Sequence, residues 1–290
     1  MRENTQAYLI ETVRYLSHEI GERSYLDVKK LNRTSDFIEQ EFRESGCTVK
    51  RQPFTYEGNT YYNIIGEVNS GLDTPAGTLV IGAHYDTVVG TPGADDNASG
   101  VAGLLELARL VAASPGQGKI SFVAFSLEEP PVFLTSRMGS YIYAKSLHHA
   151  GTAVTGMISL EMLGYYCDSG GCQYYPSSLF RLRYPDKGNF IAFVGNRSSL
   201  MFARRLKHAF MITSSLPVES LNTFSFVPGV DFSDHRSFWK FGYPAIMITD
   251  TAFYRNPNYH GPGDTIDTLD YKRMTDLVTG LHKIIVTPGS

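Results

Sequence analysis

Two adjacent glutamates, Glu128 and Glu129, follow an apolar run in the stretch SFVAFSLEEPPVF (residues 121–133). The run is typical of a buried strand, because short segments rich in Phe and Val suit a pleated core. Successive side chains of a strand point to opposite faces, so a regular strand directs only one of the two carboxylates to a given site. The prolines that follow cannot donate to a sheet ladder, and they favour an extended Glu129. We therefore expect the strand to end near Glu128, where both carboxylates can face one site.

Other acidic and imidazole side chains flank the remaining apolar runs. The run 78–84 ends in AHYD and leads to an acidic loop, and the run 155–161 ends in a glutamate. The segment before the run 244–249 contains SDH, and the segment after it contains YHGPGDT. The candidate residues are His84, Asp86, Asp95, Asp96, Glu161, Asp231, Asp234, His235 and His260.

So many carboxylates at one place require a compensating charge. Ionised carboxylates packed together away from water cost several kcal/mol each unless a cation balances them. The strand ends carry no matching Arg or Lys, so bound metal is the simplest compensation. Mixed His and carboxylate ligands suit zinc, and there are enough of them for two ions that share one bridging carboxylate.

The elements that position these residues alternate along the chain. After two early helices and a strand pair around Gly58-Asn59, strands and helices follow each other, interrupted by a Tyr- and Gly-rich segment at 164–187. This alternation predicts an α/β fold with three αβα layers and a central mixed, largely parallel sheet, with ligand sites at the carboxyl ends of the strands. No repeat or linker divides the chain, so we expect one domain over residues 1–290. The expected helices are 4–20, 27–45, 98–113, 137–149, 198–211 and 269–286, and the expected strands are 47–56, 60–68, 78–84, 120–127, 155–161, 189–195 and 244–249.

The composition limits partners and compartment. The chain has 290 residues, 42% of them hydrophobic, and a formal net charge of −3, which argues against nucleic acid or an anionic membrane as the main partner. No apolar run approaches the ~20 residues that span a bilayer. The first twenty residues contain no signal-peptide pattern, which favours the cytoplasm, although a processed secreted or periplasmic chain would look the same. Of the three cysteines, Cys167 and Cys172 could bridge in an oxidising compartment, but free thiols are expected. The oligomeric state stays open.

Six fragments together resemble a known family. AHYD, PGADDNASG, EE, an acidic residue before MLGYY, SDH and YHGPGDT occur in the order seen in zinc-dependent aminopeptidases of the co-catalytic exopeptidase clan. That family includes bacterial leucyl-type aminopeptidases, and glutamate carboxypeptidases and glutaminyl cyclases are its relatives. The similarity covers residues 60–270. It implies a zinc-exopeptidase-like fold and two Zn²⁺ ions per chain.

The resemblance also implies which residues bind zinc. One ion would be held by His84 and Glu161 and the other by Glu129 and His260, with Asp96 bridging them. The residues alone leave Asp95 as a rival for the bridging position.

The catalytic roles implied by the resemblance are those of a hydrolase. A zinc-bridged hydroxide would be the nucleophile, Glu128 the general base, and Asp86 the residue that orients His84. Substrates would be peptides with a free N-terminus, because the carboxylate ring would also bind the α-ammonium group.

Two departures from the family pattern bear on the metal geometry and on substrate access, respectively. Glu161 stands where the aminopeptidases commonly have Asp. The segment PPVFLTSR (130–137) replaces a Gly-rich turn beside the base. Possible substrate contacts are His235, Asp234, Tyr165 and Tyr259, for each of which a packing role is the alternative.

Three other functions remain open at this point. A glutaminyl-cyclase-like acyltransferase would use the same scaffold with one zinc ion. A carboxypeptidase would require a basic clamp, for which the candidates are Arg181, Arg183, Arg197 and Arg255. A non-catalytic metal-binding module has no use for Glu128 beside a full ligand set.

Overall fold

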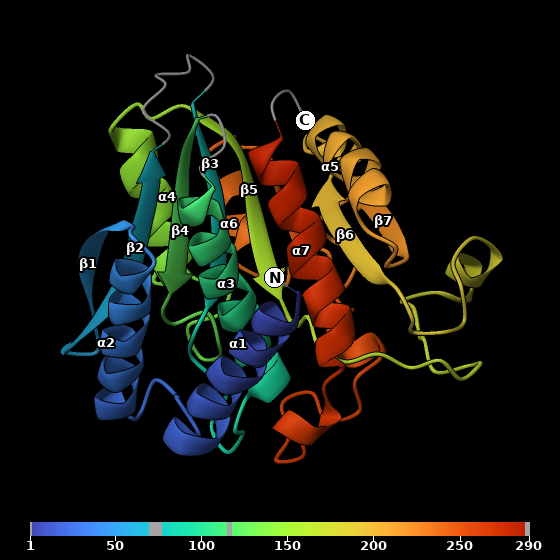
Figure 1. Ribbon diagram of the computed structural model, residues 1–290, viewed down its shortest axis with the longest axis horizontal. Coiled ribbons are helices and arrows are strands. Elements are labelled where there is room, and N and C mark those ends of the chain that lie inside the picture. The colour runs from blue at the N-terminus through green and yellow to red at the C-terminus, as the bar shows by residue number, and fades with distance from the viewer. Residues whose placement is uncertain (1, 70–76, 115–117, 288–290) are drawn as a thin grey trace.

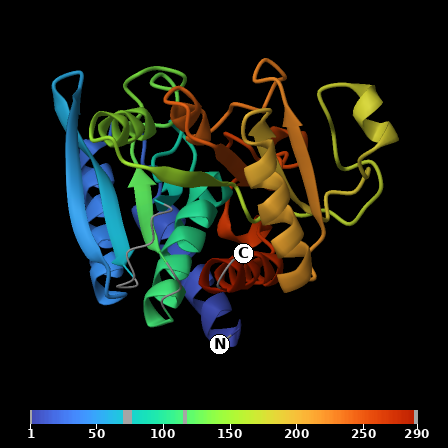
Figure 2. The ribbon, with the colours of Figure 1, turned by 90° about the horizontal axis from the view of Figure 1, so that it is seen from above.

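A computed structural model describes residues 2–69, 77–114 and 118–287. These residues form three layers, a central sheet with helices on both of its faces (Figures 1 and 2). The sheet has eight strands in the order β1-β2-β4-β3-β5-β8-β6-β7. The strands are β1 (Thr48–Tyr56), β2 (Asn59–Asn69), β3 (Thr78–His84), β4 (Lys119–Phe125), β5 (Val154–Glu161), β6 (Ile191–Asn196), β7 (Val218–Thr223) and β8 (Ala245–Thr249).

The sheet is mixed, with a parallel centre. Strands β4, β3, β5 and β8 are parallel neighbours, whereas β1 with β2, β2 with β4, and β6 with β8 are antiparallel pairs. The carboxyl ends of the four central strands therefore lie at one edge, which is where ligand sites form in such sheets. The expected α/β fold with a mixed, largely parallel sheet is confirmed.

Helices cover both faces of the sheet. In Figure 2, α1, α2, α3, α5 and α7 lie on one side of the sheet, and α4 and α6 lie on the other. The main apolar core lies on the α3 side, where Leu104, Leu107 and Leu281 are buried, and a second core includes Tyr143 of α4 and Phe238 of α6. The helices are α1 (Arg2–Arg14), α2 (Val28–Glu44), α3 (Gly100–Ala113), α4 (Gly139–His149), α5 (Leu200–Thr213), α6 (His235–Trp239) and α7 (Tyr271–Val286), and a π-helical turn η1 (Tyr15–Ile20) continues α1. None of the helices in the described parts of the chain is long and apolar enough to cross a membrane.

Three elements differ from the expected ones. Strand β4 ends at Phe125 rather than at residue 127, because Leu127 has a positive φ of 61° that breaks the extended backbone before the glutamates. Strand β7 was not expected, since VESLNT contains no apolar run, and its side chains are all half-buried at the edge of the sheet. Helix α6 was also not expected, because five residues are too few for a periodic pattern to show.

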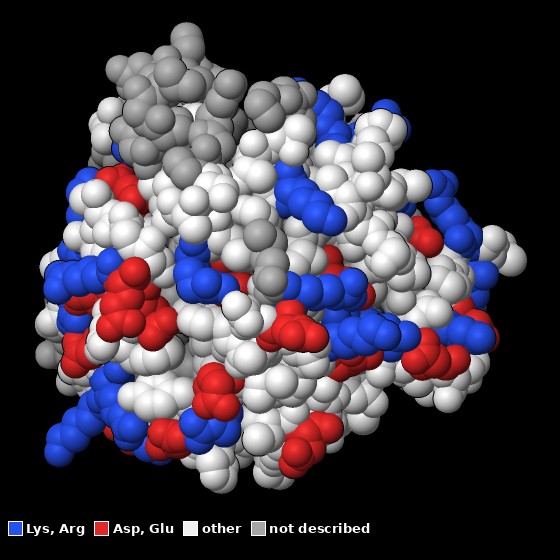
Figure 3. Space-filling view, in the orientation of Figure 1, with Lys and Arg blue, Asp and Glu red and all other residues white. Residues whose placement is uncertain are grey.

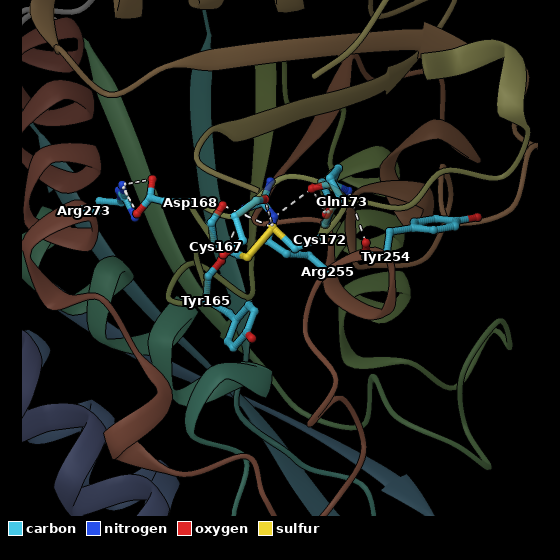
Figure 4. Close-up of a disulfide and its surroundings, with 10 residues drawn as sticks. Tyr165, Cys167, Asp168, Cys172, Gln173, Tyr254, Arg255 and Arg273 are labelled. Carbon is cyan, nitrogen blue, oxygen red and sulfur yellow. Dashed lines mark hydrogen bonds and ion pairs between the residues drawn. A yellow bond between two sulfur atoms is a disulfide. The ribbon is translucent and has the colours of Figure 1, made fainter. Parts of the chain in front are cut away.

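The expectation of free thiols at Cys167 and Cys172 is wrong, because the two cysteines form a disulfide (Figure 4). The chain between them turns back so that their Cα atoms lie 6.4 Å apart, within the usual range for a disulfide. Sequence spacing does not reveal such a turn. Cys47 is a free, buried cysteine.

Candidate metal centre

The carboxyl ends of the central strands bring the predicted ligands together. His84 ends β3, Glu161 ends β5, and Glu129 lies in the turn after β4. Asp96 belongs to η2 (Ala94–Ser99), which precedes α3, and His260 lies in the loop after β8. All of them are buried except His260, whose side chain is 29% exposed.

These ligand atoms form two groups that share one residue. In the first group, His84 Nε2 lies 3.3 Å from Glu161 Oε1 and 3.4 Å from Asp96 Oδ1. In the second group, His260 Nε2 lies 3.2 Å from Asp96 Oδ2 and 3.3 Å from Glu129 Oε2. Within each group the ligand atoms lie within 4.8 Å of one another. Asp96 thus directs one oxygen to each histidine, which is the arrangement of a bridging carboxylate.

The residues fit a divalent metal. Among the described residues, the buried oxygens Asp96 Oδ1 and Glu129 Oε1 have no hydrogen-bond partner. An unpaired buried carboxylate oxygen is costly unless a cation compensates it. Each group offers one imidazole nitrogen and two carboxylates, a donor set that zinc accepts.

The ionisable groups of the cluster perturb one another strongly. Burial works against protonation of His260, but hydrogen bonds to Asp96 and Glu129 raise its pKa to about 10. Burial and the nearby Asp96 charge raise the pKa of Glu129 to about 8. Burial also disfavours the charged form of Asp96, yet its contacts with His260 and His84 outweigh that and lower its pKa. The cluster thus favours the protonated form of His260, and metal binding, which requires a neutral imidazole, would compete with that proton.

Asp86 fixes the backbone of the glutamate pair. Its Oδ1 accepts a hydrogen bond from the Glu128 amide and its Oδ2 accepts one from the Glu129 amide, each at 3.0 Å. Its backbone carbonyl lies 3.1 Å from His84 Nδ1. Burial, followed by the effects of nearby charges that include Glu129, raises the pKa of Glu128 well above its ordinary value.

Asp264 fixes the backbone of the pair Asp95-Asp96 in the same way, although the sequence did not predict a role for it. Asp264 accepts hydrogen bonds from the Asp95 amide at 2.8 Å and from the Asp96 amide at 3.0 Å. Asp95 itself accepts from the Gly164 amide and from Asn256 Nδ2, both at 2.8 Å. Its carboxylate is therefore engaged by other partners, whereas Asp96 faces both histidines. The signal for Asp264 was its place in the GPGDT fragment.

A buried arginine lies behind the cluster and was also missed. Arg23 is fully buried, and its charge interacts with those of Asp264, Asp86 and Asp96. Its guanidinium donates hydrogen bonds of 2.8–2.9 Å to the carbonyls of Leu16, Gly21, Tyr85, Pro92 and Gly93. Arg23 comes from the segment between η1 and α2, far from any strand end, so no motif pointed to it.

Two of the possible substrate contacts lie inside the protein. His235 is fully buried, its Nε2 lies 2.8 Å from the Val230 carbonyl, and its ring packs edge-on against Trp239. Asp234 is also fully buried, and its charge contributes to the raised pKa of Glu128. Neither offers an exposed face, which favours the packing alternative for His235, whereas both carboxylate oxygens of Asp234 lack a hydrogen-bond partner among the described residues.

A cavity with an empty volume of about 810 Å³, including its mouth, opens beside Glu161. Tyr259 lines it and stacks on His260 with the ring centroids 3.7 Å apart. Tyr165 is not among the lining residues, and its backbone amide donates to Asp250. The aromatic lining residues are Tyr174, Tyr175, Phe180, Tyr184, Phe190, Phe232, Phe253, Tyr254 and Tyr259.

The segment 130–137 contacts Phe232, one of the residues that line this cavity. The Val132 and Phe133 amides donate to the carbonyl of Glu129. The Phe133 ring contacts Phe232 edge-on, with centroids 5.5 Å apart. The segment that departs from the family pattern thus joins the turn bearing the glutamates to the aromatic lining.

The chain is similar to several known proteins along most of its length. The E. coli (strain K12) protein named "Uncharacterized protein YfbL" is 44% identical over 98% of this chain and 88% of that protein. Leucine aminopeptidase 1 of Coccidioides posadasii is 25% identical over 94% of the chain, and the chain matches 66% of that enzyme's length.

Solved structures of low sequence identity share the fold. A zinc aminopeptidase from Bacillus subtilis has a TM-score of 0.74 at 15% identity, over 98% of this chain and 96% of that one. Glutaminyl cyclase from Bacteroides thetaiotaomicron has a TM-score of 0.71 at 18% identity, over 99% of this chain and 98% of that one.

The model of peptidase family M28 matches residues 63–284, which carry all the candidate ligands. The expected resemblance to zinc exopeptidases is therefore confirmed. The chain belongs to peptidase family M28.

Proposed function

We propose that the protein is a di-zinc aminopeptidase that hydrolyses the N-terminal residue from peptides. The observation that carries this proposal is the pair of ligand groups that share Asp96. His84 and Glu161 would hold one ion, Glu129 and His260 the other, and Asp96 would bridge them.

Glu128 is the proposed general base. When bound, a zinc pair supplies Lewis acidity that polarises the scissile carbonyl and makes water easier to deprotonate near neutral pH. A carboxylate beside such a site can take a proton from water and later return it to the leaving amine. Glu128 suits this role because it is buried next to Glu129 and Asp86 holds its backbone in place.

The surroundings of the site support action at the N-terminus. None of the described residues that line the cavity is Arg or Lys, so the cavity offers no basic clamp for a substrate carboxylate. Arg255, a candidate for such a clamp, instead donates to Gln173 Oε1 and to the Phe190 carbonyl. The clustered carboxylates can attract an α-ammonium group, and the aromatic cavity suits an apolar side chain of the N-terminal residue.

Two ligand groups favour hydrolysis over cyclisation. A single-zinc cyclase would require only one of them, whereas here both groups offer three ligands. The similarity to glutaminyl cyclase, at 18% identity, supports the fold alone.

We also propose that the protein works in an oxidising compartment, contrary to the cytoplasmic expectation. The Cys167–Cys172 disulfide supports this, because disulfides seldom persist in reducing cytosol. Cells that produce the protein are treated with a thiol-alkylating reagent before lysis. Cys167 and Cys172 should stay unmodified, and their alkylation would overturn the proposal.

One experiment tests the proposed activity directly. Zinc-loaded protein is incubated with peptides that carry a free, an acetylated or a glutaminyl N-terminus, and the products are identified by mass spectrometry. Release of the N-terminal residue from the free peptide alone, abolished by chelation, is expected. Pyroglutamate formation or trimming from the C-terminus would contradict the proposal.

A further inference from the structure

The Cys167–Cys172 disulfide (Figure 4) belongs to neither ligand group, and Cys172 immediately precedes Gln173, which lines the apolar cavity. Resting on the proposed function, we propose that this disulfide positions the outer wall of the cavity, residues 173–176, and so sets the preference for a bulky apolar N-terminal residue. Cys172 is followed at once by Gln173, Tyr174, Tyr175 and Pro176, all of which line the cavity.

Gln173 connects the outer wall to other residues that line the cavity. Its side chain is buried, its Nε2 donates to Thr251 Oγ1 at 2.9 Å, and its Oε1 accepts from Arg255 Nε at 2.8 Å. The next amide, that of Tyr174, donates to the carbonyl of Tyr254 at 2.8 Å. Thr251 and Tyr254 themselves line the cavity. The position of Gln173 therefore determines where the outer wall lies relative to Thr251 and Tyr254.

The other half of the disulfide is attached to the chain that enters β6. The Cys167 amide donates to the Gly188 carbonyl at 2.9 Å, and the Arg255 guanidinium donates to the Tyr165 and Phe190 carbonyls at 3.3 and 2.9 Å. The neighbouring Asp168 accepts two hydrogen bonds from Arg273 of α7 (Figure 4). Cys167 is thus held to the body of the protein, and the disulfide extends that attachment to the residue that begins the outer wall.

The outer wall has little local structure of its own. Residues 173–177 belong to no helix or strand. Their order depends on the contacts of Gln173 and Tyr174, on the Tyr175 hydroxyl, which donates to the Pro185 carbonyl, and on the covalent link. Cross-linking a short loop removes conformational freedom that the open chain would have. Small thiols can open the link by exchange: two thiols become one disulfide, and the protein gains two cysteine thiols. The freed segment then presents Tyr174 and Tyr175 less regularly to a substrate side chain.

Opening the disulfide should weaken the binding of a substrate with a bulky N-terminal side chain more than that of a substrate with a small one. Glu161 and residues 173–176 line the same cavity, and a benzyl group reaches further into it than a methyl group, so the larger side chain depends more on the outer wall. Loss of the wall contacts removes binding but leaves the reacting atoms in place, so the effect belongs in KM and not in kcat.

The test compares the wild type with the double variant Cys167→Ser/Cys172→Ser, both zinc-loaded, on the p-nitroanilides of phenylalanine and alanine. We expect KM for the phenylalanine substrate to rise about three- to ten-fold, while its kcat and both alanine constants change by less than about two-fold. The variant Cys47→Ser, which keeps the disulfide, is the matched control and should behave as wild type. Circular dichroism checks that all variants are folded.

Calorimetric binding of phenylalaninamide and alaninamide measures the same preference without turnover. A double variant with an unchanged ratio of phenylalanine to alanine affinity would overturn the inference, as would an equal loss for both ligands. If wild-type protein cleaves neither anilide, the proposed function fails, and the calorimetric ratio still decides the role of the disulfide.

Discussion

At the scale of single residues, the same hydrogen-bonding arrangement occurs twice in the candidate site. Asp86 holds both backbone amides of the pair Glu128-Glu129, and Asp264 holds both amides of the pair Asp95-Asp96. Glu129 and Asp96 each contact a histidine. Their neighbours differ, since Glu128 is the proposed general base and Asp95 accepts hydrogen bonds from Gly164 and Asn256. Adjacent carboxylates can divide their work in this way because the backbone is fixed in a turn, not in a regular strand.

The glutamate pair should separate proton transfer from metal binding. We expect Glu128→Gln to lower kcat about 10²- to 10⁴-fold, because a positioned general base contributes that much. Its zinc content should stay at the wild-type value. The neighbouring variant Glu129→Gln should instead lose one zinc ion per chain, measured by metal analysis after gel filtration. Zinc loss in Glu128→Gln with retained turnover would reverse the two assignments.

Asp264 should act on the metal through Asp96. In Asp264→Asn only one oxygen can accept, so one of the two amides loses its acceptor and the pair Asp95-Asp96 shifts. We expect zinc affinity, measured by competition with a chelating dye, to fall about 10- to 100-fold, as is typical for such supporting groups. Asp267→Asn, an exposed position three residues on, is the control. Equal affinities in the two variants would show that Asp264 has no such role.

His235 should make stability depend on pH. Burial lowers its pKa from 6.5 to about 4, so the unfolded chain takes up a proton on this residue at a higher pH than the folded chain. The contribution is present above pH 6.5 and is lost as the pH falls toward 4, by on the order of 3 kcal/mol in full. Urea denaturation of wild type and His235→Gln at pH 7.5 and 5 measures the difference. The variant should lose less stability on acidification, and identical losses would contradict the buried, neutral histidine.

At the scale of elements, the sequence predicted the central strands and their ends well and the edges poorly. The runs that became β3, β4, β5 and β8 are apolar because both of their faces are covered, and residues at their ends could be assigned to one site without any tertiary information. Strand β7 is half-buried and polar, so its pairing depends on contacts with β6 that no local pattern shows. The disulfide and Arg23 depend in the same way on how distant segments meet.

Arg23 should stabilise the protein by holding the N-terminal segment against the loop that precedes Asp95 and Asp96. Its guanidinium binds five carbonyls from two separate segments, and a lysine has neither the number nor the fork geometry of donors to replace it. We expect Arg23→Lys to lower the free energy of unfolding by about 2–4 kcal/mol, since buried acceptors lose their partners. Arg43→Lys, at an exposed arginine paired with Glu39, should change it by less than about 0.5 kcal/mol. Urea denaturation measures both, and equal effects would contradict this role of Arg23.

At the scale of the whole molecule, the buried carboxylates of the site contrast with a surface of mixed charge. On the face shown in Figure 3, Lys and Arg side chains are interspersed with Asp and Glu side chains. Arg51, for example, pairs with both Asp36 and Glu39. In the metal cluster, Asp96, Glu129 and Glu161 form no ion pair with a Lys or Arg of the described residues. Two zinc ions would add four positive charges, which exceed the formal net charge of −3.

Metal binding should therefore stabilise the entire fold. A ligand that binds only the folded chain adds about 2.7 kcal/mol when its free concentration is 100 times Kd, and each kcal/mol raises Tm by about 2–4 °C in a chain of 150–250 residues. We expect dipicolinate to lower Tm by about 5 °C or more, and added zinc to restore it. The shift should be smaller in Glu129→Gln, which keeps only the group of His84, Asp96 and Glu161. If wild-type protein kept its Tm after complete zinc removal, the carboxylates would have to be neutral or otherwise compensated in the folded chain. The metal would then act in catalysis alone and would not hold the sheet ends together.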